Sequence, residues 1–130
     1  MGLSGKKAVV FGGTSGIGLA AALLLAKNGA EVTAVSRKPD KAGTLPSGVS
    51  LRACDVLDRS AVEAVFSELS PIDILVTAAT GGKRAFGPFL EMDMDGYKGS
   101  FDKLWGYANV VRYGAKHVTD GGSITLVSGA

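Results

Sequence analysis

Short apolar runs alternate with longer segments of helical pattern along the whole of this chain. Runs such as Ala8-Val9-Val10-Phe11 are continuously apolar, which is typical of strands that are buried on both faces of a parallel sheet. Five strands are predicted, over residues 6–11, 31–36, 49–53, 72–76 and 123–127.

The segments between these strands carry helix patterns with recognisable boundaries. Helices are predicted over residues 16–28, over 58–69, and over a long stretch that begins between 93 and 97 and ends near 118. Gly29 suits the left-handed cap of the first helix. The second helix starts at Asp58, or at Ser60 with Glu63 as a capping box, and Pro71 stops it. The weak segment before residue 48 predicts only a short helix or turn.

The long third helix has a less regular pattern than the first two. Its buried face is expected to consist of apolar residues at helical spacing: Phe101, Leu104, Trp105, Ala108 and Val111. Gly99, Gly106 and Gly114 interrupt it. A turn at residues 120–122 then leads into the last strand.

Strands that alternate with helices indicate an α/β fold with a parallel, doubly wound sheet of the Rossmann type. Right-handed crossovers around the first strand give the strand order 3-2-1-4-5. We expect one domain over residues 1–130, truncated after strand five, with no repeat or linker.

Composition and charge exclude several classes of protein. The 14 basic and 12 acidic residues give a net charge of +2 without a block of one sign, which predicts no nucleic-acid and no membrane partner. No run approaches the roughly 18 apolar residues of a membrane span, and the N-terminus lacks an apolar signal segment. A single cysteine, Cys54, fits a reducing cytoplasm, and one histidine, His117, leaves no metal site.

The glycine-rich stretch between the first strand and the first helix carries the main functional signal. A strand, a glycine turn and a helix are what a dinucleotide-binding turn requires, with the phosphates at the helix N-terminus. Gly12 allows a tight turn, Gly16 allows close approach of the pyrophosphate, and Gly18 lets the helix pack close to the sheet. The expected phosphate-binding residues are Gly12, Thr14, Ser15, Gly16, Ile17 and Gly18. An ordinary glycine-rich turn is the alternative.

The spacing of these glycines, with Gly16-Ile17-Gly18 at its end, resembles the short-chain dehydrogenase/reductase family. Phe11 stands where the family usually has Thr. The resemblance covers essentially the whole chain but only about the first half of a family domain. It implies hydride transfer between a nicotinamide cofactor and a small-molecule carbonyl or alcohol substrate.

The end of the second strand decides between the two nicotinamide cofactors. An NAD-preferring fold places Asp or Glu there for the ribose 2′-hydroxyl, whereas this chain has Ser36-Arg37-Lys38. A guanidinium pairs with a 2′-phosphate, so Ser36 and Arg37 predict NADP(H), with NAD(H) disfavoured. The alternative is that Arg37 and Lys38 belong to a solvated loop, which suits Lys38 better.

Two further segments match the family beside the cofactor. Asp55-Val56, after the third strand, resembles the pair that reads adenine, although an aspartate that caps a turn is the alternative. Ala78-Ala79-Thr80, after the fourth strand, resembles the family segment near the cofactor ribose. Thr77 and Thr80 stand where the family usually has Asn and Gly, and their hydroxyls are expected to replace part of the hydrogen bonding lost with the Asn. Asp73 is interpreted as structural.

The family's catalytic residues are only partly matched. Lys103 fills the slot of the usual Asn, while Ser128 and Gly129 fill the two Ser positions, the second being the catalytic one. Ser128 could take the place of the catalytic Ser only if the end of the fifth strand shifts by one residue. No Tyr-x-x-x-Lys pair exists, because Tyr97, Tyr107 and Tyr113 are followed four residues later by Phe101, Val111 and His117.

The sequence therefore predicts the cofactor-binding part of an NADP(H)-dependent oxidoreductase, inactive as residues 1–130 alone. A non-catalytic nucleotide-binding module, or a fragment completed by another chain, is the alternative. The resemblance implies a homo-oligomer, a dimer or tetramer, with the long helix between subunits. His117 is interpreted as a surface residue, whereas Trp105, the phenylalanines and Cys54 are expected in the core.

Overall fold

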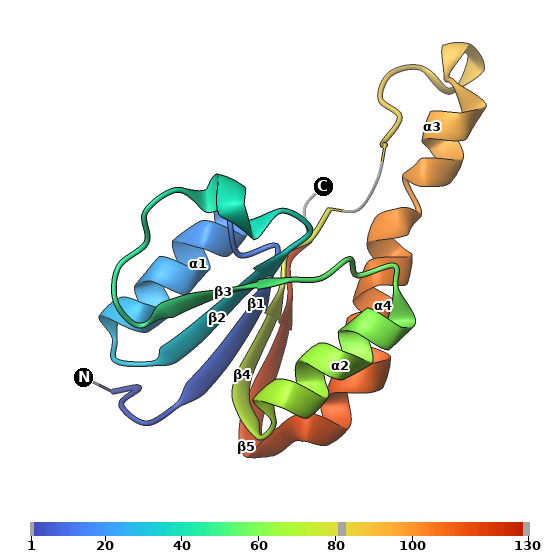
Figure 1. The fold of residues 1–130 in the computed structure, drawn as a ribbon. Coiled ribbons are helices and arrows are strands. Elements are labelled where there is room, and N and C mark those ends of the chain that lie inside the picture. Colours follow the sequence, from blue (N-terminus) through green and yellow to red (C-terminus); the bar gives the residue numbers. More distant parts are fainter. Residues whose placement is uncertain (1, 81–82, 129–130) are drawn as a thin grey trace.

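A parallel five-stranded sheet in the order β3-β2-β1-β4-β5 forms the centre of the computed structural model, which describes residues 2–80 and 83–128 (Figure 1). The strands are β1 (Lys7–Phe11), β2 (Glu31–Ser36), β3 (Val49–Ala53), β4 (Ile72–Thr77) and β5 (Val118–Leu126). The predicted fold class and strand order are confirmed.

Helices cover both faces of this sheet. One face carries α1 (Gly16–Lys27), and the other carries α2 (Arg59–Leu69) and α4 (Asp102–Gly114), which lie side by side (Figure 1). The short helix α3 (Met94–Gly99) projects away from the sheet beyond the start of α4. Single 3-10 turns occupy Pro39–Ala42, Phe89–Glu91 and Ala115–His117.

Local sequence explains where the first two helices begin and end. The Asp58 carboxylate accepts a hydrogen bond from the Ala61 N–H at 3.1 Å, so Asp58, rather than Ser60, caps α2. Gly29 follows α1 with φ +101°, the left-handed conformation predicted for it.

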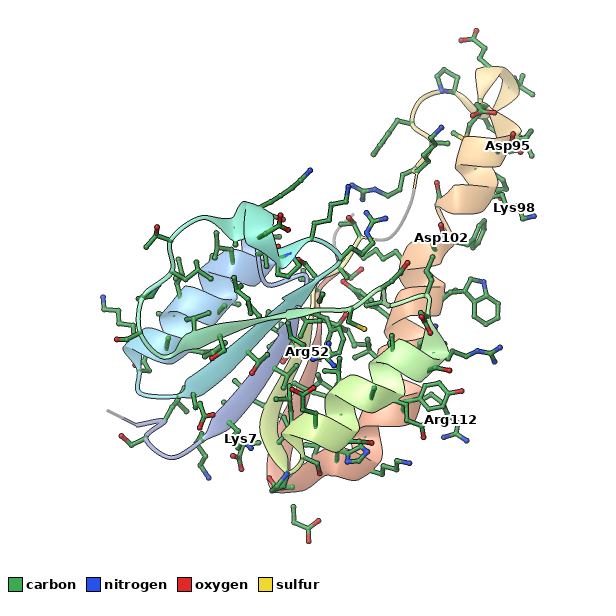
Figure 2. All side chains as sticks on the ribbon, in the orientation of Figure 1. Lys7, Arg52, Asp95, Lys98, Asp102 and Arg112 are labelled. Carbon is green, nitrogen blue, oxygen red and sulfur yellow. The ribbon has the colours of Figure 1, made fainter. Side chains whose placement is uncertain are left out.

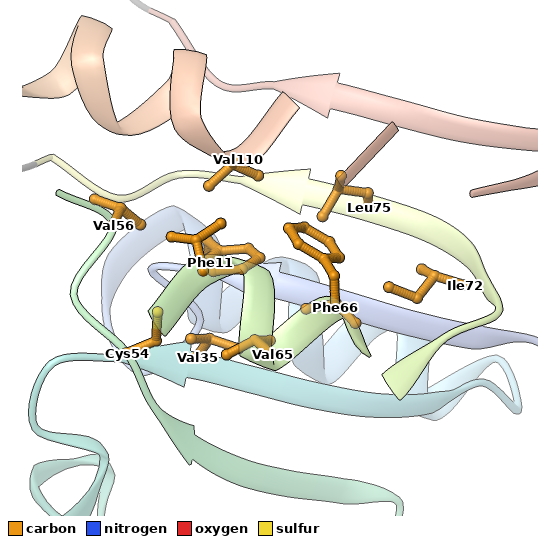
Figure 3. Packing of buried hydrophobic residues seen from close by; sticks show 11 residues of the cluster. Phe11, Val35, Cys54, Val56, Val65, Phe66, Ile72, Leu75 and Val110 are labelled. Carbon is orange, nitrogen blue, oxygen red and sulfur yellow. The ribbon is translucent and has the colours of Figure 1, made fainter. Parts of the chain in front are cut away.

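The larger core cluster lies between the sheet and the α2/α4 layer (Figure 3). Phe11 and Phe66 are fully buried there, with ring centroids 5.5 Å apart. Cys54 is buried in the same cluster, and this burial raises the pKa of its thiol to about 11. His117 stacks on Phe66 with a centroid distance of 5.9 Å and is half-buried. It therefore packs against the core and is not the surface residue that the sequence predicted.

The prediction of one long helix is wrong, because the structure breaks it at Ser100 and Phe101 into α3 and α4. The Ser100 hydroxyl donates to the Gly96 carbonyl and accepts from the Ala85 N–H, both at 3.0 Å. A Cβ at Gly99 would lie 2.2 Å from the Lys83 carbonyl oxygen. The preceding loop therefore packs directly on the break, and the serine side chain competes with the helical hydrogen bonds.

The predicted buried face of this helix is also wrong. The structure buries Gly106, Tyr107, Val110 and Gly114 instead. A Cβ would lie 2.6 Å from a methyl of Val56 at position 106, and 2.3 Å from the ring of Phe66 at position 114. The two glycines of this face let the helix axis approach its neighbours closely, and Tyr107 and Val110 fill the space between them.

Two large apolar side chains on α4, Leu104 and Trp105, are consequently exposed, as is Phe101 just before the helix. Phe101, Leu104 and Trp105 are 46%, 65% and 64% exposed. The expectation that Trp105 and all the phenylalanines are core residues is therefore wrong, since Phe86 and Phe89 are exposed as well.

The last strand starts earlier than predicted. Val118 pairs with Ile72, and the next regular pair is Ser123 with Ile74, so residues 119–122 form an irregularity within β5 rather than a turn before it. Asp73 lies opposite and accepts hydrogen bonds from the Lys7 N–H at 2.9 Å and the Thr119 hydroxyl at 3.1 Å. These bonds, the Lys7 one first, lower the pKa of Asp73 and support its interpretation as structural.

Candidate functional site

A cleft of about 740 Å³ runs along the carboxyl ends of the strands. In an open α/β sheet this edge, near the point where strand order reverses, is the usual place of a ligand. The structure brings together along this cleft every residue proposed for the cofactor: Gly12, Thr14, Ser15, Gly16, Ile17, Gly18, Ser36, Arg37, Asp55, Val56, Ala78, Ala79 and Thr80. Lys103 and Ser128 line it too, while Gly129 lies outside the described residues.

The turn between β1 and α1 forms the floor of the cleft. A Cβ at Gly18 would lie 1.9 Å from the Gly12 carbonyl oxygen, so only glycine lets α1 start this close to the strand. Gly16 has φ +53°, and a Cβ there would meet no protein atom within 4 Å. Ser15, the N-cap residue, makes no side-chain hydrogen bond to the helix. No capping side chain thus covers the first-turn N–H groups, and the helix dipole favours an anion beside them.

The β2 and β3 ends of the cleft carry the residues proposed for the adenosine part. The buried hydroxyl of Ser36 has no hydrogen-bond partner among the described residues. Arg37 follows it and is exposed. Asp55 accepts the Leu57 N–H at 2.9 Å, the turn-capping contact that was the alternative reading of this residue. Val56 is buried, and its carbonyl accepts a hydrogen bond from the Asn109 amide at 2.9 Å.

Small residues after β4 let two chain segments meet. A Cβ at Gly12 would lie 2.6 Å from the Ala79 nitrogen, so the segment after β4 passes directly against the glycine turn. The hydroxyl of Thr77 is buried without a partner among the described residues, whereas Thr80 is exposed at the cleft.

On the side of the cleft next to β5 lie Tyr107 and Arg84, which the sequence analysis did not assign to the site. The Tyr107 hydroxyl donates a hydrogen bond to the Val127 carbonyl at 2.5 Å, and the Lys103 ammonium lies 5.4 Å from the centroid of the Tyr107 ring. Burial raises the pKa of Tyr107, so the phenol stays neutral and its proton is committed to a backbone carbonyl. The Tyr107 hydroxyl is therefore not available as an acid or base in the cleft. The four-residue spacing of Lys103 and Tyr107, one helical turn, was the signal available in the sequence.

Other kinds of site find no support in the described part of the chain. Its His, Cys, Asp and Glu residues form no group of three that would hold a metal ion. None of its helices is both long enough and apolar enough to cross a membrane.

Comparison with known proteins identifies relatives over most of the chain. The family profile described as short chain dehydrogenase matches residues 6–129. Glycine betaine reductase ATRR of Emericella nidulans is 41% identical over 111 residues, which are 77% of this chain and 9% of that protein. L-xylulose reductase of Mesocricetus auratus is 36% identical over 105 residues, 78% of this chain and 42% of that protein.

Solved structures share the fold. A short chain dehydrogenase from Burkholderia cenocepacia J2315, in complex with NADP, has a TM-score of 0.80 and 28% identity, and the match covers 95% of this chain and 55% of that one. The chain thus spans less than half of each curated relative described above and about half of this structural neighbour.

Proposed function

Because this chain belongs to the short chain dehydrogenase family, we propose that it binds NADP(H) as the cofactor-binding part of an oxidoreductase acting on a small carbonyl or alcohol. The observation that carries the proposal is the open glycine turn at Gly16, at the start of a helix whose N-cap side chain makes no hydrogen bond to it. The complex of a structural neighbour with NADP supports a nicotinamide cofactor.

Different residues along the cleft bind different parts of the cofactor. The N–H groups of the first turn of α1 bind the pyrophosphate, with Gly16 leaving room for it. Arg37 pairs with the 2′-phosphate, and the orphaned Ser36 hydroxyl lies beside it. Ala78 and Ala79 let the ribose approach the backbone. A bound NADPH supplies a hydride to the substrate carbonyl, and NADP⁺ accepts one from an alcohol.

Titration of the chain with NADPH, followed by cofactor fluorescence, tests this function. We expect saturable binding of one NADPH per chain. Absence of binding at millimolar NADPH would contradict the proposal, since typical cofactor sites saturate well below that concentration.

Arg37→Ala is expected to remove most of the preference for NADPH over NADH. Charge-assisted hydrogen bonds to phosphate contribute about 1.5–3 kcal/mol, so the ratio of the two dissociation constants should fall by roughly ten- to a hundredfold. Calorimetric titration of both cofactors measures the ratio. The matched control is Lys38→Ala, because Lys38 is the next residue but does not line the cleft. Equal affinities of the parent chain for both cofactors would contradict the assignment.

A non-catalytic nucleotide-binding module is the second candidate function. Two observations favour it: Lys103 stands where the family usually has Asn, and the Tyr107 hydroxyl is committed to Val127. NADPH oxidation in the presence of carbonyl compounds separates the two candidates. Residues 1–130 alone should bind NADPH without oxidising it, and turnover by this chain would refute the assignment of an incomplete catalytic set.

We further propose that the chain associates with a second copy through the exposed apolar side chains of α4. Leu104 and Trp105 are each about two-thirds exposed, and exposed apolar surface of this kind favours association. Light scattering should show a mass above that of a 13.2 kDa monomer, and Trp105→Gln should lower it. Ala108→Gln, on the same exposed side of the helix without a large apolar group, is the control. A monomeric parent chain at high concentration would refute this association.

A further inference from the structure

The charges along the cleft are unevenly distributed. Among the described residues that line it, the charged ones are Arg37, Asp55, Arg84 and Lys103. Asp55 follows β3 and Arg37 follows β2, whereas Arg84 comes after β4 and Lys103 lies on α4 beside the end of β5. The β4/β5 side therefore presents two cations and, within the described part of the cleft lining, no carboxylate.

Lys103 is held in place at this side. Its ammonium lies over the ring of Tyr107, and the Tyr107 hydroxyl is tied to the Val127 carbonyl, which fixes the ring beside the end of β5. Lys103 is half-buried, and no carboxylate of a described residue lies within 4.0 Å of it. A half-buried ammonium has three donors and gains most from an anionic partner. Tyr107 acts here as a positioning residue.

Arg84 adds a second cation to the same side, because the next residue, Ala85, donates its N–H to the Ser100 hydroxyl at 3.0 Å, three residues before Lys103. Its guanidinium lies 5.4 Å from the centroid of the Phe86 ring, and both side chains line the cleft. A guanidinium stacked on a ring keeps its edge N–H groups for a planar or tetrahedral anion. No described carboxylate pairs with Arg84 either.

We propose that Lys103, assisted by Arg84, binds a carboxylate or phosphate group of the substrate, so that the substrate is an anionic carbonyl or alcohol. This inference rests on the proposed function, because it names the substrate class of the same cleft.

The cofactor's own phosphates are the other source of the same chemistry. Strand order separates the two sources, since β2, which leads to Arg37, lies three strand spacings from β5, roughly 14 Å. The glycine turn that faces the pyrophosphate follows β1, between them. Lys103 should therefore contribute to substrate affinity and not to NADPH affinity.

A matched pair of small ketones tests the proposal by binding alone. Levulinate and hexane-2,5-dione share one skeleton, but the first carries a carboxylate where the second carries an acetyl group. Both are titrated into the ¹⁵N-labelled chain, with and without NADPH, and the amide shifts near the cleft are followed. We expect levulinate to bind at least about tenfold more tightly than the dione, because a charge-assisted contact is worth at least that factor.

Variants of Lys103 then test whether its side chain causes the preference for levulinate. Lys103→Gln should remove the preference for levulinate, and Lys103→Arg should retain it, while NADPH affinity stays within about twofold in both. Lys98→Gln is the matched control, because Lys98 lies on α3 outside the cleft and points away from the sheet (Figure 2). This control should leave the preference for levulinate unchanged.

Three outcomes would overturn the inference. They are equal binding of the two ketones, loss of NADPH affinity in Lys103→Gln as large as the loss of levulinate affinity, and an equal effect of Lys98→Gln. If the parent chain bound no NADPH, the proposed function would fail, yet the titrations without cofactor would still report on Lys103. The two failures are therefore distinguishable.

Discussion

Gly16→Val is expected to weaken NADPH binding by more than about a hundredfold while the chain remains folded. Gly16 lines the cleft at the first turn of α1, and a Cβ there meets no protein atom within 4 Å, so a side chain would occupy open space at the cleft. A branched side chain there displaces the pyrophosphate from the N–H groups that bind it. Loss of two charge-assisted hydrogen bonds costs about 3–6 kcal/mol, which corresponds to at least a hundredfold in affinity.

Backbone strain has to be separated from this steric effect. Gly16 has φ +53°, so any β-branched residue there costs roughly 1–2 kcal/mol of stability. Gly43→Val is a control for backbone strain alone, because Gly43 has φ +72° and ψ −157°, a region that essentially only glycine adopts, has open space around its Cβ, and lies outside the cleft. Gly43→Val should lose at least as much stability in urea as Gly16→Val, and only Gly16→Val should lose NADPH binding. Undiminished binding by Gly16→Val would mean that the turn does not face the cofactor.

The strands and the glycine turn were predictable because their signals are local. Buried parallel strands need continuous apolar runs, and such runs occur in only a few places along this chain. The bounds of β2 and β3 agree with the sequence prediction to the residue. The steric reason for Gly18, its contact with Gly12, lies within the same turn and was equally accessible.

The packing of α4 was not predictable from its pattern of hydrophobic residues. Such a pattern ranks positions by the size of the apolar side chain, which selects Leu104 and Trp105. The helix instead packs through Gly106 and Gly114, whose contacts with Val56 and Phe66 depend on a neighbouring helix and loop far away in the sequence. Shape complementarity between distant segments decides such a face, and the sequence of one helix does not contain it.

The residues of the candidate site next to β5 were only partly predicted from the sequence, for a similar reason. Lys103 was identified because it fills a family position, but Tyr107 acquires its role from a hydrogen bond to Val127, twenty residues away. Arg84 lies in a glycine-containing loop whose course no periodic pattern predicts.

Phe66→Ala is expected to lower the free energy of unfolding by about 3–5 kcal/mol, the usual cost of deleting a fully buried phenylalanine. Phe66, on α2, is 0% exposed and packs against Phe11 of β1 (Figure 3). Its ring also stacks on His117 beyond α4, so it joins the sheet to both helices of that layer. The ring also fills the space against Gly114, where a Cβ would lie 2.3 Å away, so residue 114 has no side chain to fill the cavity from that side. Urea unfolding followed by circular dichroism measures the loss.

Phe86→Ala is the control for this variant, because Phe86 is 80% exposed and its removal should change stability by less than about 0.5 kcal/mol.

Phe66→Ala should affect binding at the two ends of the cleft differently. The phosphate turn starts α1 on the opposite face of the sheet, so the folded fraction should keep its NADPH affinity. Lys103 is carried by α4, which loses its packing against Phe66, so the preference for levulinate should weaken. A stability loss below about 1 kcal/mol would show that α2 and α4 are not held to the sheet through this side chain.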